Sequence, residues 1–213
     1  MENKDKLIIN IGRQVGSGGR IIAKLLADEF ECQFYDKEIL NLAAKESGFS
    51  EKFFEQNDEQ RGFIQTLFSM HAPLISDNNF YNNKFSQDGL FQFQSEAITK
   101  AADEGSCVFV GRAADYVLRT YPNVVNIFIT ANMKDRIKLV CQRLGCDEKD
   151  AKKLIIDKES ERASYYNYYT GKKWGHSCSY DLCINSSYMG LEKTAKFIGD
   201  YIRVRFGYNS KER

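Results

Sequence analysis

A glycine-rich turn at residues 12–20, GRQVGSGGR, has the residue types and the spacing of an anion-binding loop. It follows the apolar run 7–11 and opens onto an amphipathic segment, 21–30, which is the order strand, loop, helix. Glycines let successive backbone N–H groups converge on one point, and the positive end of the following helix adds to their attraction for phosphate. A tight turn is the alternative, but it would not require so many glycines. The candidate phosphate-binding residues are Arg13, Gly16, Ser17, Gly18, Gly19 and Arg20.

Short apolar runs that alternate with helix-length segments would position this loop. Strands are predicted at 7–11, 33–35, 107–110, 124–129 and 182–184, and helices at 18–29, 37–47, 89–104, 133–144 and 191–204. Such alternation implies right-handed crossovers and a parallel sheet. The 213 residues are therefore predicted to form a single α/β domain, 1–213.

Two segments interrupt this alternation. Residues 49–88 are polar and aromatic, and residues 147–180 are densely charged and then aromatic. Insertions at the carboxyl edge of such a sheet commonly bind a second substrate or form a lid. The alternatives are a helical excursion that completes the core for the first segment and a surface loop for the second.

Composition narrows the class of protein. Lys and Arg total 30 against 29 Asp and Glu, so a net charge of +1 gives no reason to expect nucleic acid or an anionic membrane as partner. No apolar stretch reaches membrane-spanning length, and the N-terminus does not resemble a signal peptide. We expect a cytoplasmic protein in which the six cysteines are reduced, with Cys107 and Cys183 buried. The oligomeric state is not readable from the sequence.

Four segments together resemble the cytidylate kinase-like family, a divergent branch of the P-loop nucleoside monophosphate kinases. They are IGRQVGSGGRIIAKLLA, FYDKEIL, FVGRAADYVLR, and ERASYYNYYTGKKW followed by YDLCINS. The resemblance implies a three-layer P-loop NTPase fold with a five-stranded parallel sheet, a nucleoside monophosphate-binding insertion at 49–88 and a lid at 147–180. It also implies ATP as donor, Mg²⁺ as cofactor and small-molecule nucleotides as substrates.

The implied reaction is transfer of the γ-phosphoryl group of a nucleoside triphosphate to a small acceptor, most simply a pyrimidine nucleoside monophosphate. Two alternatives stay open. One is a nucleotide-binding or regulatory protein with weak or no turnover, and the other is a P-loop kinase whose acceptor is not a nucleotide.

The glycine loop departs from the family at one position. An alignment without gaps places Gly19 on the lysine of the G-x-x-x-x-G-K pattern, and Arg20 on the position that normally supplies a metal-binding hydroxyl. Either Arg20 or Arg13 could supply the missing positive charge, because one guanidinium group can donate hydrogen bonds to two phosphate oxygens at once. Ser17 could offer the hydroxyl to a metal. A solvent-exposed Arg20 without a ligand is the alternative.

Asp36 ends the second predicted strand, where the family places an aspartate that faces the active site. The resemblance implies that it binds magnesium through water or orients the acceptor phosphate. A carboxylate buried there without a cation or donors would be costly, although Asp36 is also suited to cap the following helix. The residues that follow, 37–42, differ from the family's nucleotide-binding run and leave the acceptor open.

Two arginines complete the candidate site. Arg112 matches the arginine of the family's Gly-Arg-Asp run and is implied to bind the acceptor, with Asp115 as the displaced aspartate that caps a helix or faces the site. A structural pair between Arg112 and an aspartate is the alternative. Arg162 matches the lid arginine of Asp-x-x-Arg and is implied to neutralise the transferring phosphoryl group, so Arg20, Asp36 and Arg162 are the candidate catalytic residues. Ile155 replaces a second lid arginine, for which nearby lysines could substitute: Lys152, Lys153 or Lys158.

Overall fold

The computed structural model describes residues 6–36 and 84–207. The predicted helix at 37–47 and most of the predicted insertion at 49–88 lie outside the described residues. Five strands form one parallel sheet in the order β2-β3-β1-β4-β5. Their bounds are β1 (Ile8–Arg13), β2 (Gln33–Tyr35), β3 (Cys107–Val110), β4 (Val124–Thr130) and β5 (Leu182–Asn185). All five predicted strands are confirmed, and β1 extends two residues beyond its predicted end, so Arg13 belongs to the strand.

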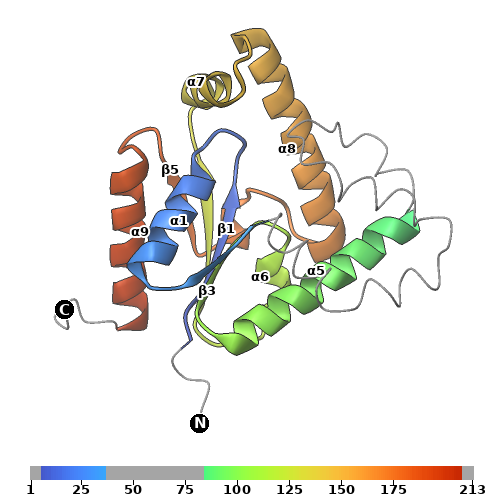
Figure 1. Cartoon of the computed structure of the whole chain (residues 1–213), viewed down its shortest axis with the longest axis vertical. Helices are drawn as coiled ribbons and strands as arrows, with labels where there is room; N and C mark the ends of the chain where they lie inside the picture. The colour runs from blue at the N-terminus through green and yellow to red at the C-terminus, as the bar shows by residue number, and fades with distance from the viewer. Residues whose placement is uncertain (1–5, 37–83, 208–213) are drawn as a thin grey trace.

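Helices cover both faces of the sheet and make three layers (Figure 1). The helices on one face are α1 (Gly19–Glu29) and α9 (Leu191–Phe206). Those on the other are α5 (Lys84–Glu104), α6 (Ala114–Val117) and α8 (Glu148–Thr170), with α7 (Met133–Leu144) near the carboxyl end of β4. None of the described helices is both long and apolar enough to span a lipid bilayer.

The alternation of side chains along β1 decides what faces each layer. Ile9 and Ile11 are buried against α1 and α9, whereas Ile8 is buried on the opposite face of the sheet with Ile98 of α5. Because successive side chains of a strand point to opposite faces, Asn10 faces the same layer as Ile8. The α8 side of the sheet therefore carries a polar residue two positions after Ile8.

The predicted lid at 147–180 is mostly one long helix, so the surface-loop alternative is wrong. The Asp147 side chain accepts the N–H of Asp150 at 2.8 Å and caps α8, and Gly171 ends the helix with φ 67°. Near the C-terminal end of α8, the ring of Tyr169 stacks on Phe91 of α5 with centroids 4.1 Å apart. The short 3-10 helix η3 (Ser177–Ser179) follows. Packing of aromatic rings on α5 stabilises a segment of modest helix propensity.

The cysteines are free thiols, as expected, but the two that were predicted to be buried differ. Cys107 of the inner strand β3 is fully buried. Cys183 is exposed, so its predicted burial is wrong: β5 is the edge strand of the sheet, and its apolar sequence does not reveal that position.

Candidate active site

The glycine loop joins β1 to α1 in the conformation that its sequence predicts. Gly16 and Gly18 have φ of 77° and 73°, values that residues with a Cβ rarely adopt. Within residues 6–36 and 84–207, no hydrogen bond engages the N–H groups of Gly16, Gly18 or Gly19. These N–H groups are therefore available to donate hydrogen bonds to an anion, although the phosphate site itself stays a prediction.

Ser17 maintains the shape of the loop. Its hydroxyl donates to the carbonyl of Gln14 at 2.9 Å, and its own carbonyl accepts the hydroxyl of Ser186 at 2.8 Å. The residue is buried. A serine side chain buried inside the loop is poorly placed to ligate a metal ion.

The side chain of Arg13 crosses the loop and enters the site. A Cβ on Gly19 would lie 2.6 Å from the Arg13 Cβ, and a Cβ on Gly111 would collide with the Arg13 guanidinium. Burial, and then the charges of Arg162 and Arg112, hold the pKa of Arg13 well below its usual value. A guanidinium stays protonated in proteins, so this lowered pKa marks a positive charge that a bound anion would stabilise.

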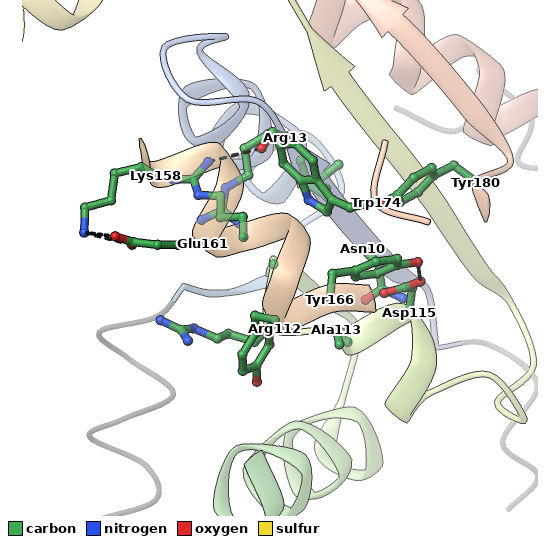
Figure 2. Close-up of a pocket in the computed structure, with 16 residues that line it drawn as sticks. Asn10, Arg13, Arg112, Ala113, Asp115, Lys158, Glu161, Tyr166, Trp174 and Tyr180 are labelled. Atoms are coloured by element: carbon green, nitrogen blue, oxygen red, sulfur yellow. Dashed lines mark hydrogen bonds and ion pairs between the residues drawn. The ribbon is translucent and has the colours of Figure 1, made fainter. Parts of the chain in front are cut away.

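Arg13, Arg112 and Arg162 line one cavity of about 180 Å³ between the sheet and α8 (Figure 2). Arg162 donates from Nη1 to the Arg13 carbonyl at 3.1 Å, and burial is the main cause that lowers its pKa to about 10. Arg112 and Ala113 have positive φ values, 61° and 53°, which cost free energy for residues with a Cβ. Strained backbone and crowded positive charge thus occur together at this cavity.

Of the lysines considered as substitutes for a second lid arginine, Lys158 lines the cavity and Lys152 and Lys153 do not. The Lys158 ammonium lies 2.9 Å from a carboxylate oxygen of Glu161, which also lines the cavity. Lys158 therefore brings a positive charge to the cavity together with a negative one.

Arg20 and Asp36 pair with each other. Arg20 donates from Nε and Nη2 to one oxygen of Asp36, at 2.8 and 2.6 Å. Asp36 is buried, as its position predicts, whereas the Arg20 side chain is 57 % exposed, and neither residue lines the cavity. Their catalytic and phosphate-binding roles stay predictions, while the geometry shows Arg20 neutralising the Asp36 carboxylate.

An ion pair between buried Arg136 and half-buried Glu159 fixes the loop to α7 and α8. Arg136 donates from Nη2 to Glu159 at 2.5 Å and from Nε to the Val15 carbonyl at 2.8 Å, and Glu159 accepts the Val15 N–H at 3.2 Å. Both backbone groups of Val15 are thereby held by α7 and α8. The lid helix is therefore attached to the glycine loop through Glu159 as well as Arg162.

The cavity also contains the buried carboxylate of Asp115. One of its oxygens accepts the Tyr166 hydroxyl at 2.7 Å, and the Lys172 ammonium lies 3.7 Å away. Burial outweighs these contacts and raises the pKa of Asp115. Arg112 is not an ion-pair partner of Asp115 or Asp36 within the part of the chain that the structure describes.

This raised pKa gives a testable prediction for stability. The folded protein binds the Asp115 proton more tightly than the unfolded chain, so stability is lost as pH rises from the ordinary carboxyl range through the raised pKa. Asp115→Asn keeps an acceptor for Tyr166, and we expect its melting temperature at neutral pH to equal or exceed that of wild type. The difference should vanish below about pH 4, as thermal unfolding across pH would show.

The matched control is Asp103→Asn, because exposed Asp103 accepts the Tyr121 hydroxyl at a similar 2.8 Å. It should give no gain at neutral pH. A lower melting temperature of Asp115→Asn at neutral pH would mean that Tyr166 and Lys172 outweigh the cost of burial.

Comparisons with known proteins identify the family of the chain. The model of the cytidylate kinase-like family matches residues 8–188. The cytidylate kinase of Pyrococcus horikoshii is 26 % identical over 186 residues, which cover 86 % of this chain and 82 % of that protein.

Among solved structures, a protein from Eubacterium ventriosum is 29 % identical with a TM-score of 0.71, covering 92 % of this chain and 98 % of the other. A shikimate kinase from Bacteroides thetaiotaomicron, 12 % identical with a TM-score of 0.51 over the same shares, shows only the shared P-loop kinase fold. With its glycine loop, parallel sheet and matched segments, the chain belongs to the cytidylate kinase-like family.

Proposed function

We propose that this chain transfers the γ-phosphoryl group of a nucleoside triphosphate to a small acceptor, most simply a pyrimidine nucleoside monophosphate. The observation that carries the proposal is the meeting of Arg13, Arg112 and Arg162 in one cavity beside the glycine loop. The family and the fold support a P-loop phosphotransferase. The positive charges of Arg162 and Arg112 help to lower the pKa of Arg13, and that of Arg112 helps to lower the pKa of Arg162, which supports an acceptor and a donor that are both anionic.

In this proposal Arg13 takes the role of the absent loop lysine. The G-x-x-x-x-G-K pattern begins with a glycine six residues before its lysine, and these two positions fall on Arg13 and Gly19. Glycine and cation have thus exchanged places. The contact between the Arg13 side chain and Gly19 explains the exchange, because a side chain at position 19 would collide with Arg13.

In this proposal Arg112 and Arg162 have separate roles. Arg112, on the strained turn after β3, would hold the anionic group of the acceptor, and Arg162 would neutralise charge on the phosphoryl group in transit. Because α8 is bonded to the loop through Arg162 and Glu159, the helix would also exclude water from the reacting groups. Catalysis would then rest on position and charge.

ATP and Mg²⁺ are the donor and cofactor that the family suggests. The described residues do not fit the usual P-loop magnesium site, because Arg20 replaces the hydroxyl residue and the Ser17 side chain is buried. Asp36 is the remaining candidate and is paired with Arg20. We place the enzyme in the cytoplasm, where its free thiols would stay reduced.

Pyrophosphate provides a direct test of the anion site. It should raise the melting temperature more than sodium chloride of equal ionic strength, because it relieves the repulsion among the arginines, and it should protect the amides of residues 16–20 from hydrogen exchange. Adenosine is the uncharged comparison and should do neither. Equal effects of pyrophosphate and salt, with no protection of the loop, would contradict an anion site there.

A further inference from the structure

Two cysteines flank the joint between α7 and α8. Cys141 lies in the last turn of α7, and Cys146 directly precedes Asp147, the residue that caps α8. Both are free thiols that are neither fully buried nor fully exposed. They pack against the apolar cluster between the two helices, whose buried members are Val140, Ala151 and Ile155. The proposed phosphoryl transfer uses neither thiol.

The way in which α7 ends brings the two side chains together. Gly145 has φ 66° and donates its N–H to the Cys141 carbonyl at 2.8 Å, which is a left-handed turn that commonly ends a helix. In such a turn the residue after the glycine often packs on the residue that supplies this carbonyl. Here these residues are Cys146 and Cys141, and their thiols interact directly through a side-chain hydrogen bond. Side chains in contact meet the first requirement for a disulfide.

The surroundings distinguish the two thiols. Burial, and then the charge of Cys146, raise the pKa of Cys141. The carboxylates of Glu148 and Asp147 act in the same direction. A thiol with a raised pKa is a poor nucleophile, because little of it is ionised. Cys146 is therefore the thiol that reacts first with an oxidant, and Cys141 is the one that completes the bond.

We propose that Cys141 and Cys146 form a reversible disulfide when a hydroperoxide reaches the protein, and that this bond restrains the joint between α7 and α8. The Cys146 thiolate attacks the peroxide, the O–O bond breaks, and Cys146 becomes a sulfenic acid. The alkoxide that leaves takes up the proton that Cys146 lost. Cys141 then attacks the sulfenic sulfur to form the S–S bond, and its thiol proton leaves with the sulfenic hydroxyl as water. The two thiols lose two electrons, and the hydroperoxide gains them.

The position of the bond decides its effect. Arg136 of α7 and Glu159 of α8 together hold both backbone groups of Val15 in the glycine loop. A disulfide across the joint ties the end of α7 to the start of α8 and limits the movement of α8 away from that loop. The bond forms whether or not the cavity binds a nucleotide, so the proposal does not depend on the proposed function. In a reducing cytoplasm the bond is transient.

Peptide mapping tests the bond directly. Trypsin cleaves after Arg143, between the two cysteines, so residues 139–143 and 144–149 stay together only if a disulfide joins them. The reduced, folded protein is treated with hydrogen peroxide, its remaining thiols are alkylated, and it is then unfolded and digested. We expect the two peptides as one species, lighter than their sum by two hydrogens, which dithiothreitol separates.

Cys178 and Cys183 are the matched control, because they have the same spacing in the sequence and are more exposed. Tyr180 between them is extended and Cys183 lies in β5, so the chain holds these two thiols apart. This pair should form no disulfide. Absence of the linked peptides, or disulfides at both pairs alike, would overturn the proposal, since the second result would assign the reaction to sequence spacing and not to the fold.

Thermal unfolding and hydrogen exchange test the restraint. A disulfide that the folded chain accommodates stabilises it, so the linked protein should melt at a higher temperature than the reduced protein, and dithiothreitol should reverse the shift. Exchange at the amides of residues 144–151 should slow. Peroxide should cause neither change in Cys141→Ser, which keeps every other oxidisable side chain. A lower melting temperature of the linked protein, or unchanged exchange at the joint, would contradict the restraint.

Discussion

Arg13→Met should lower kcat/KM for phosphoryl transfer by about 10³-fold, the lower end of the effect of an arginine on phosphoryl transfer. Methionine keeps the unbranched stem that covers Gly19 and removes the charge that contacts Gly111. Because Arg13 is buried and repelled by Arg112 and Arg162, the variant should be no less stable than wild type. The variant should therefore lose activity while its melting temperature stays equal to or above that of wild type.

Arg119→Met is the matched control, because exposed Arg119 donates to the carbonyl of Tyr116, lies over the Tyr116 ring and does not line the cavity. Its activity should be unchanged. Arg20→Ala, which removes the partner of Asp36, should cost about tenfold. A larger loss for Arg20→Ala than for Arg13→Met would assign the loop charge to Arg20 instead. Activity should return in part when Arg13→Gly is combined with Gly19→Lys, since the two substitutions restore the usual pattern together.

Arg162→Ala should lower kcat by about 10³-fold and change the KM of either substrate much less. The side chain lies in the cavity and donates to the Arg13 carbonyl, and burial lowers its pKa to about 10. Burying the positive charge of Arg162 costs free energy. That charge would stabilise the transition state, in which negative charge develops on the phosphoryl group. Steady-state kinetics with both substrates varied would separate kcat from KM.

Lys152→Ala is the control on the same helix, because Lys152 is exposed and does not line the cavity. It should leave both constants unchanged. Hydrogen exchange should also show residues 147–180 protected by a triphosphate plus an acceptor. A variant of Arg162 that loses affinity and keeps kcat would place the arginine in ground-state binding.

Much of the fold follows from local sequence patterns. The apolar runs predicted all five strands, because buried parallel strands are continuous apolar segments between helices. The glycine loop was predictable because Gly16 and Gly18 need positive φ. The capping residue Asp147 and the terminal Gly171 mark the ends of α8 in the sequence, although the segment was predicted as a lid without a helix of its own and a surface loop was the alternative.

Contacts between distant residues were not predictable. Arg136 binds Val15 and Glu159, which lie in two other segments, and no local pattern identifies such a buried pair. The sequence left the choice between Arg13 and Arg20 open, because it depends on which side chain crosses the loop. Asn10 is visible in the sequence as a polar residue inside an otherwise apolar strand.

The central claim is that the cationic cavity catalyses phosphoryl transfer to a small anionic acceptor. The most direct measurement is formation of nucleoside diphosphate from ATP, with magnesium, and each nucleoside monophosphate in turn. We predict ADP formation above the rate with ATP alone for at least one pyrimidine monophosphate, and its loss in Arg162→Ala. ADP formation at the background rate with every monophosphate, from a protein that binds pyrophosphate at its glycine loop, would contradict the claim and leave a nucleotide-binding protein without turnover.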